Sequence, residues 1–427
     1  VAHAQVVEGL DGRWEGAIAP SNGAPGRAVF HVATQDRRTT VAIDSLVNRG
    51  DIGWTLRGPS GDIAGRAFSD ADGAENAGAV AWRLASGAYT LVVDGSAATT
   101  GGYAFRLLDL GAADTLAYDT DIAVTLNPGS ATQAYRIDAA AGDRLLFDLA
   151  SMSGGNATWR LIDPTGFPVF GPVLLNADVG PLTLLQSGAY ALLIEGRIWE
   201  AANTVSVGFK LTKQGNDGVP VLTGTAVDIG ARIDGTISAA GETDDYVFEI
   251  TEASRIVFDG FAPNDGRWRF SIDGPRGTEI GGRAIYNAES YELSGDPAIA
   301  LVLPGTYRVR ITADSGLTGD YAFRILDLEA SATPLTPGTP VSSSLNPSNE
   351  SEIYRFDALA GEQLFIDIQA FSPNYGDWAT WRLYDPLGRP VFGTRGFHLN
   401  NDVDVLTLDT SGSYTLLIEG RIWAPAN

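Results

Sequence analysis

The chain has 427 residues, no cysteine, and a formal net charge of −23 from 52 acidic and 29 basic residues. The lack of cysteine excludes disulfide bonds, thiolate metal sites and cysteine nucleophiles, and the negative charge disfavours a nucleic-acid backbone or an anionic membrane surface as a partner. No apolar run approaches the ~18 residues that a membrane helix needs, so we expect no membrane span.

The composition favours many short strands and turns over long helices. Hydrophobic residues make up 44% of the chain, which is enough for packed cores, while 51 glycines and 21 prolines supply frequent turn positions. Apolar and polar residues alternate over short stretches between these turns, which is typical of antiparallel sandwiches. We therefore predict an all-β chain of tandem antiparallel, jelly-roll-like β-sandwich domains.

A chain of this length exceeds one ordinary domain, and a recurring segment divides it into four units. The predicted units are residues 1–110, 111–214, 215–328 and 329–427. In chain order, the predicted strands are 28–32, 40–44, 88–94 and 103–110 in the first unit, 135–137, 144–148, 188–195 and 205–211 in the second, 246–248, 255–259, 305–311 and 321–328 in the third, and 354–356, 363–367 and 412–419 in the fourth.

The recurring segment is a predicted hairpin, found around Pro59, Pro164, Pro275 and Pro386. These prolines are 105, 111 and 111 residues apart, and each stands five positions after an aromatic residue and three after a Leu or Ile. Residues two apart on an extended chain share a face, so we expect each aromatic and its aliphatic neighbour to enter a core. A glycine two residues after each proline suits the turn. Four regularly spaced copies indicate an internal repeat.

The units alternate between two types, which we name A and B. Residues 102–110 of the first unit nearly duplicate residues 320–328 of the third, while residues 192–199 of the second recur letter for letter as residues 416–423 of the fourth. The repeating element is therefore a pair of domains, and two pairs are present.

The fourth unit differs from the second at its end. Asn427 matches Asn203, so the fourth unit has no counterpart of the last predicted strand of the second, residues 205–211. A sandwich without one strand exposes backbone groups and a core groove. Either the segment ends early, or another chain fills the place by strand addition.

Several of these motifs resemble the bacterial pre-peptidase C-terminal (PPC) domain family. They are an Asp/Glu-x-Tyr-x-Phe type strand, an Ala-Gly-x-x-Leu segment, an Asp-Pro-x-Gly hairpin and a Gly-x-Tyr strand, as at residues 352–356, 360–364, 385–388 and 412–414. The resemblance covers all four units, most clearly the second and fourth, and the first unit departs most because it lacks the Ala-Gly pair. It implies jelly-roll-like sandwiches appended to secreted peptidases and surface proteins, some of which bind calcium, collagen or polysaccharide.

Calcium is the candidate metal. A pair of acidic or amide side chains, separated by one residue, begins eleven to fourteen residues after each hairpin proline. The four pairs are Asp70 and Asp72, Asn176 and Asp178, Asn287 and Glu289, Asn400 and Asp402. Oxygen ligands at alternate loop positions suit Ca²⁺, which binds six to eight oxygens. The alternative is an Asx-turn, in which the side chain caps its own backbone. Two oxygens per loop are too few alone, and Asp70 with Asp72 is the best pair.

Tryptophans provide the second candidate site. Trp54, Trp159 and Trp381 stand at the hairpin position, where we expect core packing. Trp199 and Trp423 follow Gly-Arg-Ile in type B units only, where a core role is less automatic. We predict that they pack between neighbouring units, and the alternative is a platform for a sugar or peptide.

The sequence gives little support to catalysis. His3, His31 and His398 lie far apart, and none has metal-ligand spacing with another histidine or a nearby glutamate. No nucleophile elbow or phosphate-binding glycine motif is present. Paired carboxylates recur with the repeat, as scaffold positions do. We therefore predict that the chain is not an enzyme.

These observations lead to one functional hypothesis with two alternatives. We expect a non-catalytic extracellular or bacterial cell-surface segment that acts as a stalk, fibre or surface-layer element, with neighbouring repeats or further copies of the chain as partners. The first alternative is an accessory module that binds polysaccharide or matrix protein, with calcium as a candidate cofactor. The second is the accessory tail of a secreted hydrolase.

Overall fold

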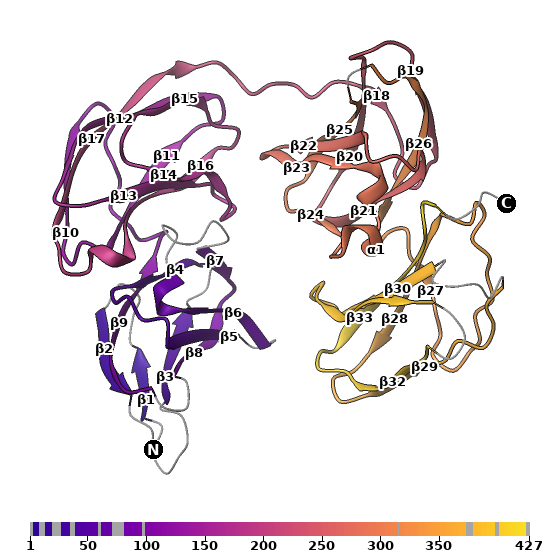
Figure 1. The fold of residues 1–427 in the computed structure, drawn as a ribbon, viewed down its shortest axis with the longest axis horizontal. Helices are drawn as coiled ribbons and strands as arrows, with labels where there is room; N and C mark the ends of the chain where they lie inside the picture. Colours follow the sequence, from indigo (N-terminus) through magenta and orange to yellow (C-terminus); the bar gives the residue numbers. More distant parts are fainter. Residues whose placement is uncertain are drawn as a thin grey trace. The chain divides into compact units, whose positions relative to one another are not determined.

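The structure is a computed structural model that describes residues 3–7, 13–18, 27–34, 39–58, 61–70, 81–95, 99–314, 316–372, 379–397 and 401–423. Over these residues the chain is nearly all β-structure, and its strands form β-sandwich domains in tandem (Figure 1). The chain divides into two compact units, Val1–Val219 and Pro220–Asn427, and each holds two sandwiches. No helix in the described ranges is long and apolar enough to cross a membrane.

The first and third sandwiches share one topology. In the first, one sheet has the spatial order β1 (His3–Val7), β3 (Arg27–Thr34), β8 (Gly87–Gly95), β5 (Ile52–Gly58) and β6 (Gly61–Ala67), and the other has the order β2 (Arg13–Ile18), β9 (Gly101–Asp109), β4 (Thr39–Ser45) and β7 (Ala81–Leu84). In the third, the sheets are β18 (Thr225–Ala226), β20 (Thr243–Ile250), β25 (Gly305–Ala313), β22 (Trp268–Gly274) and β23 (Gly277–Ala284), and β19 (Ile233–Ile237), β26 (Gly319–Asp327), β21 (Ser254–Ala262) and β24 (Ile299–Leu301).

The second sandwich is the complete type B domain. Its sheets are β11 (Thr132–Ala139), β16 (Gly188–Gly196), β13 (Ala157–Ile162) and β14 (Pro168–Leu174), and β10 (Asp121–Leu126), β17 (Val205–Asn216), β12 (Asp143–Ser153) and β15 (Val179–Thr183).

The fourth sandwich has one full sheet and one reduced sheet. The full sheet is β27 (Thr333–Pro334), β28 (Ser351–Ala358), β33 (Gly412–Gly420), β30 (Ala379–Tyr384) and β31 (Pro390–Gly396), and the reduced sheet pairs β29 (Gln363–Ile366) with β32 (Val403–Thr407). Short helical turns complete the elements: η1 (Phe68–Asp70), η2 (Ile198–Glu200), η3 (Ile285–Asn287) and α1 (Ser290–Leu293).

The predicted hairpins are confirmed in all four sandwiches. They are the antiparallel pairs β5–β6, β13–β14, β22–β23 and β30–β31. The turn glycines have positive φ, as at Gly61 (107°) and Gly166 (90°), a backbone conformation that L side chains rarely adopt. Pro59 lies outside the described residues, so its turn is not characterised.

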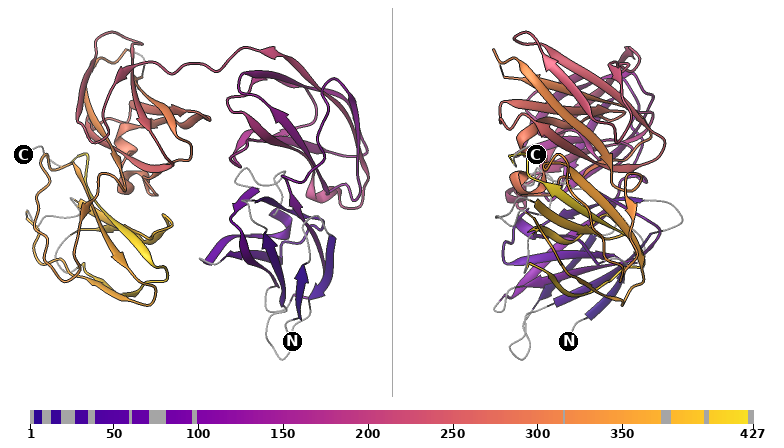
Figure 2. Two further views of the ribbon diagram at one scale, coloured as in Figure 1. Left: turned by 180° about the vertical axis from the view of Figure 1, so that it is seen from behind. Right: turned by 90° about the vertical axis from the view of Figure 1, so that its right-hand side faces the viewer.

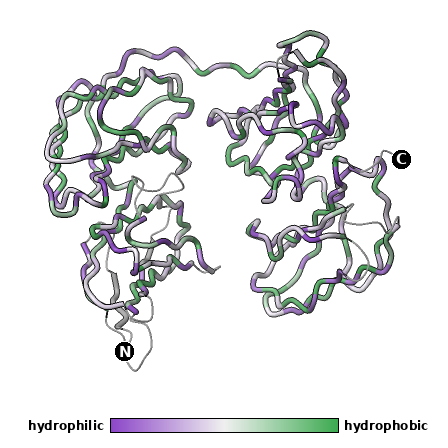
Figure 3. Tube along the Cα trace, viewed as in Figure 1, coloured by the Kyte–Doolittle hydropathy of each residue, from purple (hydrophilic) through white to green (hydrophobic). Residues whose placement is uncertain are grey.

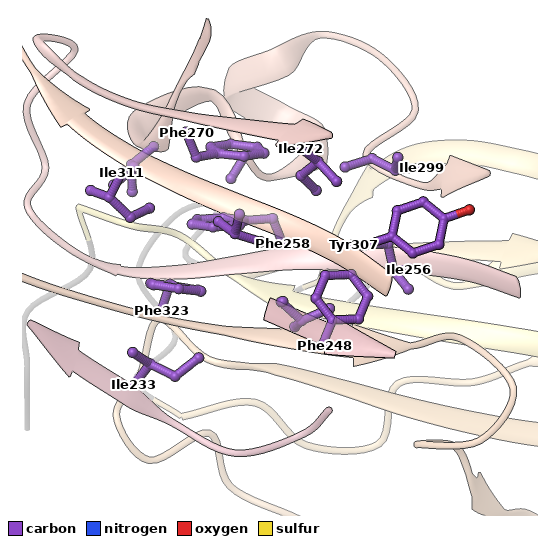
Figure 4. Packing of buried hydrophobic residues seen from close by; sticks show 14 of the residues in the cluster. Ile233, Phe248, Ile256, Phe258, Phe270, Ile272, Ile299, Tyr307, Ile311 and Phe323 are labelled. Carbon is purple, nitrogen blue, oxygen red and sulfur yellow. The ribbon is translucent and has the colours of Figure 1, made fainter. Parts of the chain in front are cut away.

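The hairpin aromatics and aliphatics enter the cores as predicted. All eight side chains are buried: Trp54, Leu56, Trp159, Leu161, Phe270, Ile272, Trp381 and Leu383. In the third sandwich the ring of Phe258 stacks between Phe270 and Phe323, with centroid distances of 3.8 and 4.7 Å (Figure 4). Hydrophobic and hydrophilic residues alternate along the strands (Figure 3), because each sheet turns one face to its own core.

Three edge strands depart from the antiparallel arrangement. The short first strands β1, β18 and β27 run parallel to β3, β20 and β28. The sequence did not indicate these strands, because two of them have only two residues and carry no alternating pattern. All other named strand pairs in the described ranges are antiparallel.

One strand in each type B sandwich is buried on both faces. All six residues of β13 and all six residues of β30 are buried. In β13, Trp159 and Leu161 point into the core of the second sandwich, whereas Ile162 belongs to an apolar cluster with Ala42 and Leu108 of the first. A type A and a type B sandwich therefore pack sheet against sheet within each unit (Figure 2).

The hairpin tryptophan gives a direct test of the core. Trp159 contacts the rings of Phe147, Phe170 and Phe209 at centroid distances of 6.1, 6.5 and 6.3 Å. We expect Trp159→Ala to lower the free energy of opening of the second sandwich by about 3–5 kcal/mol, because it leaves a cavity in a closed core.

Hydrogen-exchange mass spectrometry of peptides from β11, β13 and β16 measures this opening. The control Trp199→Ala removes the same side chain from an exposed position and should cost less than about 1 kcal/mol. Equal exchange in the two variants would contradict the assignment of Trp159 to the core.

Candidate functional site at the interdomain interfaces

The contact between the two sandwiches of each unit is the candidate functional site, because it holds most of the buried charged residues of the described chain. We name the contact of the first and second sandwiches the first interface, and that of the third and fourth the second interface. The apolar parts of the two interfaces are Ala42, Ala81, Leu108, Leu110, Ala134, Ile162, Ala191 and Leu193, and Val257, Leu326, Leu328, Ile353, Tyr384 and Leu417.

An acid–arginine pair lies inside the first interface. Asp44 on β4 is buried and accepts hydrogen bonds at Oδ2 from Nε and Nη2 of Arg106 on β9, at 2.8 and 2.6 Å. The same oxygen accepts a bond of 3.1 Å from the backbone N–H of Thr132, which belongs to the second sandwich. Arg106 also donates to the Thr132 carbonyl oxygen. The backbone N–H and C=O of one residue of the type B sandwich are thus held by both members of the pair.

The second interface repeats this arrangement with the corresponding residues. Asp259 on β21 accepts a bond of 2.7 Å from Nε of Arg324 on β26. Its carboxylate also accepts bonds from the backbone N–H and the hydroxyl of Ser351 in the fourth sandwich, at 3.2 and 2.9 Å. Arg324 donates to the Ser351 carbonyl oxygen. We call these two arrangements the ion-pair clusters.

The ion-pair clusters fix how the sandwiches meet more than they add to stability. Burial raises the pKa of Asp44 and of Asp259, against the lowering effect of Arg106 and Arg324. The attraction within a buried ion pair offsets little more than the free energy of desolvating its two charges. Removing one partner nevertheless costs about 3–5 kcal/mol, because a buried charge is left uncompensated. An A–B contact in another register would leave these groups unpaired.

The second interface also contains a group of glutamates at the short helix of the third sandwich. Glu419 at the end of β33 is fully buried and accepts bonds from the backbone N–H of Ser290, at 3.1 Å, and from its hydroxyl. In return, Glu289 of the third sandwich accepts a bond of 2.9 Å from the backbone N–H of Ile422. Each sandwich therefore places a carboxyl group on the backbone of the other.

Arg421 completes this contact. It forms an ion pair with Glu292 of α1 at 2.5 Å, and its guanidinium lies over the ring of Tyr291, 3.5 Å from the centroid. Trp423 also donates its ring N–H to Glu292, at 3.1 Å, and lies beside Arg421. Trp423 therefore takes part in the interdomain contact.

The first interface contains the matching glutamate of the type B repeat, Glu195. It is buried and pairs with Arg160 on β13, at 3.5 Å between Nε and Oε2. The segment of the first sandwich that corresponds to α1 falls within residues 71–80, outside the described ranges. Trp199 is 52% exposed, and Arg197 stacks on its ring at 4.1 Å.

A glycine follows each of these glutamates because the backbone is crowded there. A Cβ atom at Gly196 would lie 1.8 Å from the carbonyl oxygen of Gly129, and one at Gly420 would lie 2.1 Å from that of Ser348. Any side chain would push the strand end away from the neighbouring backbone. The glutamate and the glycine account for two positions in the letter-for-letter repeat of residues 192–199 at 416–423.

The residues predicted to bind calcium do not form one type of site. Asp178 and Asp402 do correspond, since each accepts a backbone bond of 2.9 Å, from Leu149 and Ile368 respectively. Glu289 instead turns into the second interface. The remaining predicted ligands are Asp70 in η1, Asn176 in an exposed turn, Asn287 at the end of η3, and Asp72 and Asn400 outside the described residues.

Among the described residues, no group of three or more His, Asp or Glu side chains is placed to hold a metal ion. Asp178 accepts its bond from β12, and Asp402 accepts its bond from the segment that follows β29, so neither caps its own turn and both differ from the Asx-turn alternative as well. Calcium binding stays a prediction.

The sequence did not single out the buried aspartates of the ion-pair clusters, Asp44 and Asp259. Asp44 and Asp259 end predicted apolar strands, as Asp148 and Asp367 do in the type B sandwiches, where they are not buried. The distinguishing residue is the arginine of the Tyr-Ala-Phe-Arg segment, which occurs only in the type A units, at Arg106 and Arg324. The repeated Ile-Glu-Gly-Arg-Ile-Trp segment was the corresponding indication for the type B units.

Burial gives the second interface a defined pH dependence. It raises the pKa of Glu419 to about 7, from 4.5, and Asp259 nearby adds to the rise, while Ser290 and Arg382 oppose it. Glu289 shifts in the same direction. Because the folded-state pKa lies above the unfolded value, the stability contributed by protonated Glu419 is complete below pH 4.5 and is lost as pH rises through about 7.

We therefore expect the free energy of unfolding of the second unit to fall between pH 4.5 and 8, with a contribution on the order of 3 kcal/mol from Glu419. Urea unfolding at several pH values measures this fall. Glu419→Gln keeps the side chain neutral, so it should flatten the pH dependence, while the exposed control Glu329→Gln should not. An unchanged slope in Glu419→Gln would contradict the shifted pKa.

No known protein family and no curated protein matches the sequence. The CUB1-EGF-CUB2 domains of rat MASP-1 align with 49% of this chain and 100% of that chain, at 9% identity and a TM-score of 0.18. Lac15 from a marine microbial metagenome aligns with 78% of this chain and 90% of that chain, at 10% identity and a TM-score of 0.15. TM-scores this low do not establish a shared fold. The resemblance to pre-peptidase C-terminal domains stays a prediction.

Proposed function

We propose that the chain is a non-catalytic structural segment of an extracellular or bacterial cell-surface protein, in which A–B pairs of sandwiches are the stiff elements of a stalk, fibre or surface layer. The observation that carries this proposal is the interdomain interface, with its ion-pair cluster, present in both pairs. The partners are neighbouring repeats or further copies of the chain.

The interfaces support stiffness because they combine two kinds of contact. The apolar faces of two sheets are buried against each other, which resists separation of the sandwiches. The ion-pair clusters add directional bonds between β4 or β21 of type A and the start of β11 or β28 of type B. Sliding or rotating one sandwich would leave Asp44 or Asp259 without its backbone partner.

Interdomain distances in the second unit test this proposal. The chain contains no cysteine, so Ala239→Cys in the third sandwich and Ala360→Cys in the fourth allow specific spin labelling at two exposed positions. We expect electron–electron distance measurements to give one narrow distribution. Adding Asp259→Ala should broaden it, because Arg324 and Ser351 lose their shared acceptor.

The matched control is Asp367→Ala, which removes the corresponding but exposed aspartate of the type B sandwich and should leave the distribution narrow. Hydrogen exchange at β21 and β22 shows whether the third sandwich itself stays folded. A broad distribution in the parent chain would contradict the proposed stiffness.

A second candidate function is the binding of polysaccharide or matrix protein by a surface aromatic. The observations that favour it are the exposed Trp199 with its stacked Arg197 and a surface cleft of about 410 Å³ in the second unit. The cleft is lined by Arg232, Phe261, Ala262, Asn264, Pro347, Asn349, Ile422 and Trp423. Aromatic faces beside charged groups are suited to sugars or peptides.

Trp199→Ala and Trp423→Ala separate the two candidate functions. Under the structural proposal, Trp423→Ala should broaden the interdomain distances of the second unit, because Glu292 loses one interdomain donor. Neither variant should alter retention on polysaccharide or collagen resins. Loss of retention by either variant with unchanged distances would favour the binding module, and repeating the assay with calcium and with a chelator tests the predicted cofactor.

A further inference from the structure

The segment that leads into the fourth sandwich carries three threonines at intervals of three positions, each followed by a proline. The three pairs are Thr333 with Pro334, Thr336 with Pro337, and Thr339 with Pro340. The chain contains no other Thr-Pro pair, and all six residues are exposed. Proline restricts the residue before it to extended conformations, so each threonine has an open backbone. We call residues 333–340 the Thr-Pro segment.

The backbone of the Thr-Pro segment is fixed at two points. Leu335 packs against the core of the fourth sandwich, and its N–H donates to the carbonyl oxygen of Arg355 at 2.7 Å. The N–H of Thr339 donates to the carbonyl oxygen of Thr336 at 3.1 Å, across a turn in which Gly338 has a φ of 82°. The segment therefore follows one defined path, with its threonine side chains on the outside.

The second sandwich makes the same bend without a Thr-Pro pair. Leu116 donates its N–H to the carbonyl oxygen of Arg136 at 2.8 Å, and Asp119, at the position of Gly338, has a φ of 59°. The counterparts of the three threonines are exposed there as well, and they are Asp114, Ala117 and Thr120. The fold therefore requires neither threonine nor proline at these positions, and their exposure is a property of the repeat.

The threonine hydroxyls make no contact that a modification would break. Within the described part of the chain, no hydrogen bond involves the hydroxyl of Thr333, Thr336 or Thr339. Ser343 differs, because its hydroxyl donates to Glu352 at 2.6 Å. An enzyme could therefore transfer a group to each threonine oxygen without disturbing the sandwich.

The charge of the surrounding sequence favours a neutral group over a phosphate. Residues 325–354 contain four acidic residues and no basic residue, in a chain with a net charge of −23. A phosphate would add about −1.5 to −2 charges to each threonine, next to charges of the same sign. A neutral sugar adds bulk and hydroxyl groups without charge, and surface segments rich in threonine and proline are typical carriers of O-linked sugars.

We propose that Thr333, Thr336 and Thr339 are O-glycosylation sites, and that each takes a hexose or N-acetylhexosamine from a sugar activated by a phosphate-containing leaving group. The threonine Oγ1 forms a bond to the anomeric carbon while the bond from that carbon to the phosphate oxygen breaks. The hydroxyl proton passes to a base of the transferase, and the leaving group keeps the bonding electrons. This inference rests on the extracellular or cell-surface role proposed above.

Trypsin, which cleaves after arginine, separates the site from a control within the same chain. Peptide 325–355 contains the Thr-Pro segment, and peptide 107–136 contains its counterpart in the second sandwich. For the full chain purified from its natural host, we expect mass spectrometry to show peptide 325–355 heavier by up to three sugars. Peptide 107–136 should have its unmodified mass, although its Thr115 and Thr120 are exposed, because neither precedes a proline.

Substitution of the threonines in the natural host tests the attachment sites. The triple variant Thr333→Ala, Thr336→Ala and Thr339→Ala should lose all of the added mass. The variant Thr333→Ser, Thr336→Ser and Thr339→Ser keeps the hydroxyls and should retain it. Both variants keep the prolines, so stiffening by proline is unchanged. The threonines are exposed, so both chains should remain folded, which hydrogen exchange at β28 and β33 checks.

The proposal is overturned if peptide 325–355 from the natural host has its unmodified mass, if it carries phosphate, or if fragmentation places the sugar on Ser342 or Ser344 alone. Equal modification of peptide 107–136 would also overturn it, because the prolines would then have no effect. The interdomain distances of the second unit are measured on a recombinant chain without sugars. The stiffness of the pairs and the glycosylation are therefore decided by separate measurements.

Discussion

The buried ion pair between two sheets is the constraint on which each pair of sandwiches depends. The carboxylates of Asp44 and Asp259 are removed from water, and they are tolerable only while Arg106 or Arg324 and the backbone of the neighbouring sandwich complete their hydrogen bonding. The apolar faces supply attraction without direction. The ion pairs add direction, because they discriminate among the positions that two flat, largely apolar sheets could otherwise adopt.

This constraint explains why the repeat has two alternating types. Type A contributes the aspartate and the arginine, while type B contributes the backbone N–H and C=O of Thr132 or Ser351 and a glutamate at the end of a strand. Two type A faces would lack the Thr132 or Ser351 backbone that completes the ion pair, and two type B faces would lack the ion pair itself. The two faces of each interface therefore have to differ.

The residue pattern predicts local structure, such as strands and turns. It does not predict contacts between residues that lie far apart in the sequence. The period of two, with proline and glycine at the turns, locates the hairpins and the cores, because Trp159 and Leu161 need only a strand to share a face. An aspartate that ends a predicted apolar strand is typical of a surface, and the burial of Asp44 depends on Arg106 and on Thr132, 88 residues away. For Glu419 the partner, Ser290, is 129 residues away. The predicted calcium positions form no common site in the described residues, because equal spacing did not produce equal loops.

The unlike faces of the two types also give the polypeptide an orientation. Within each described pair, the type A sandwich precedes the type B sandwich and meets it through a face that the type B sandwich does not possess. Each pair therefore has two unlike ends, with the type A sandwich at one end and the type B sandwich at the other.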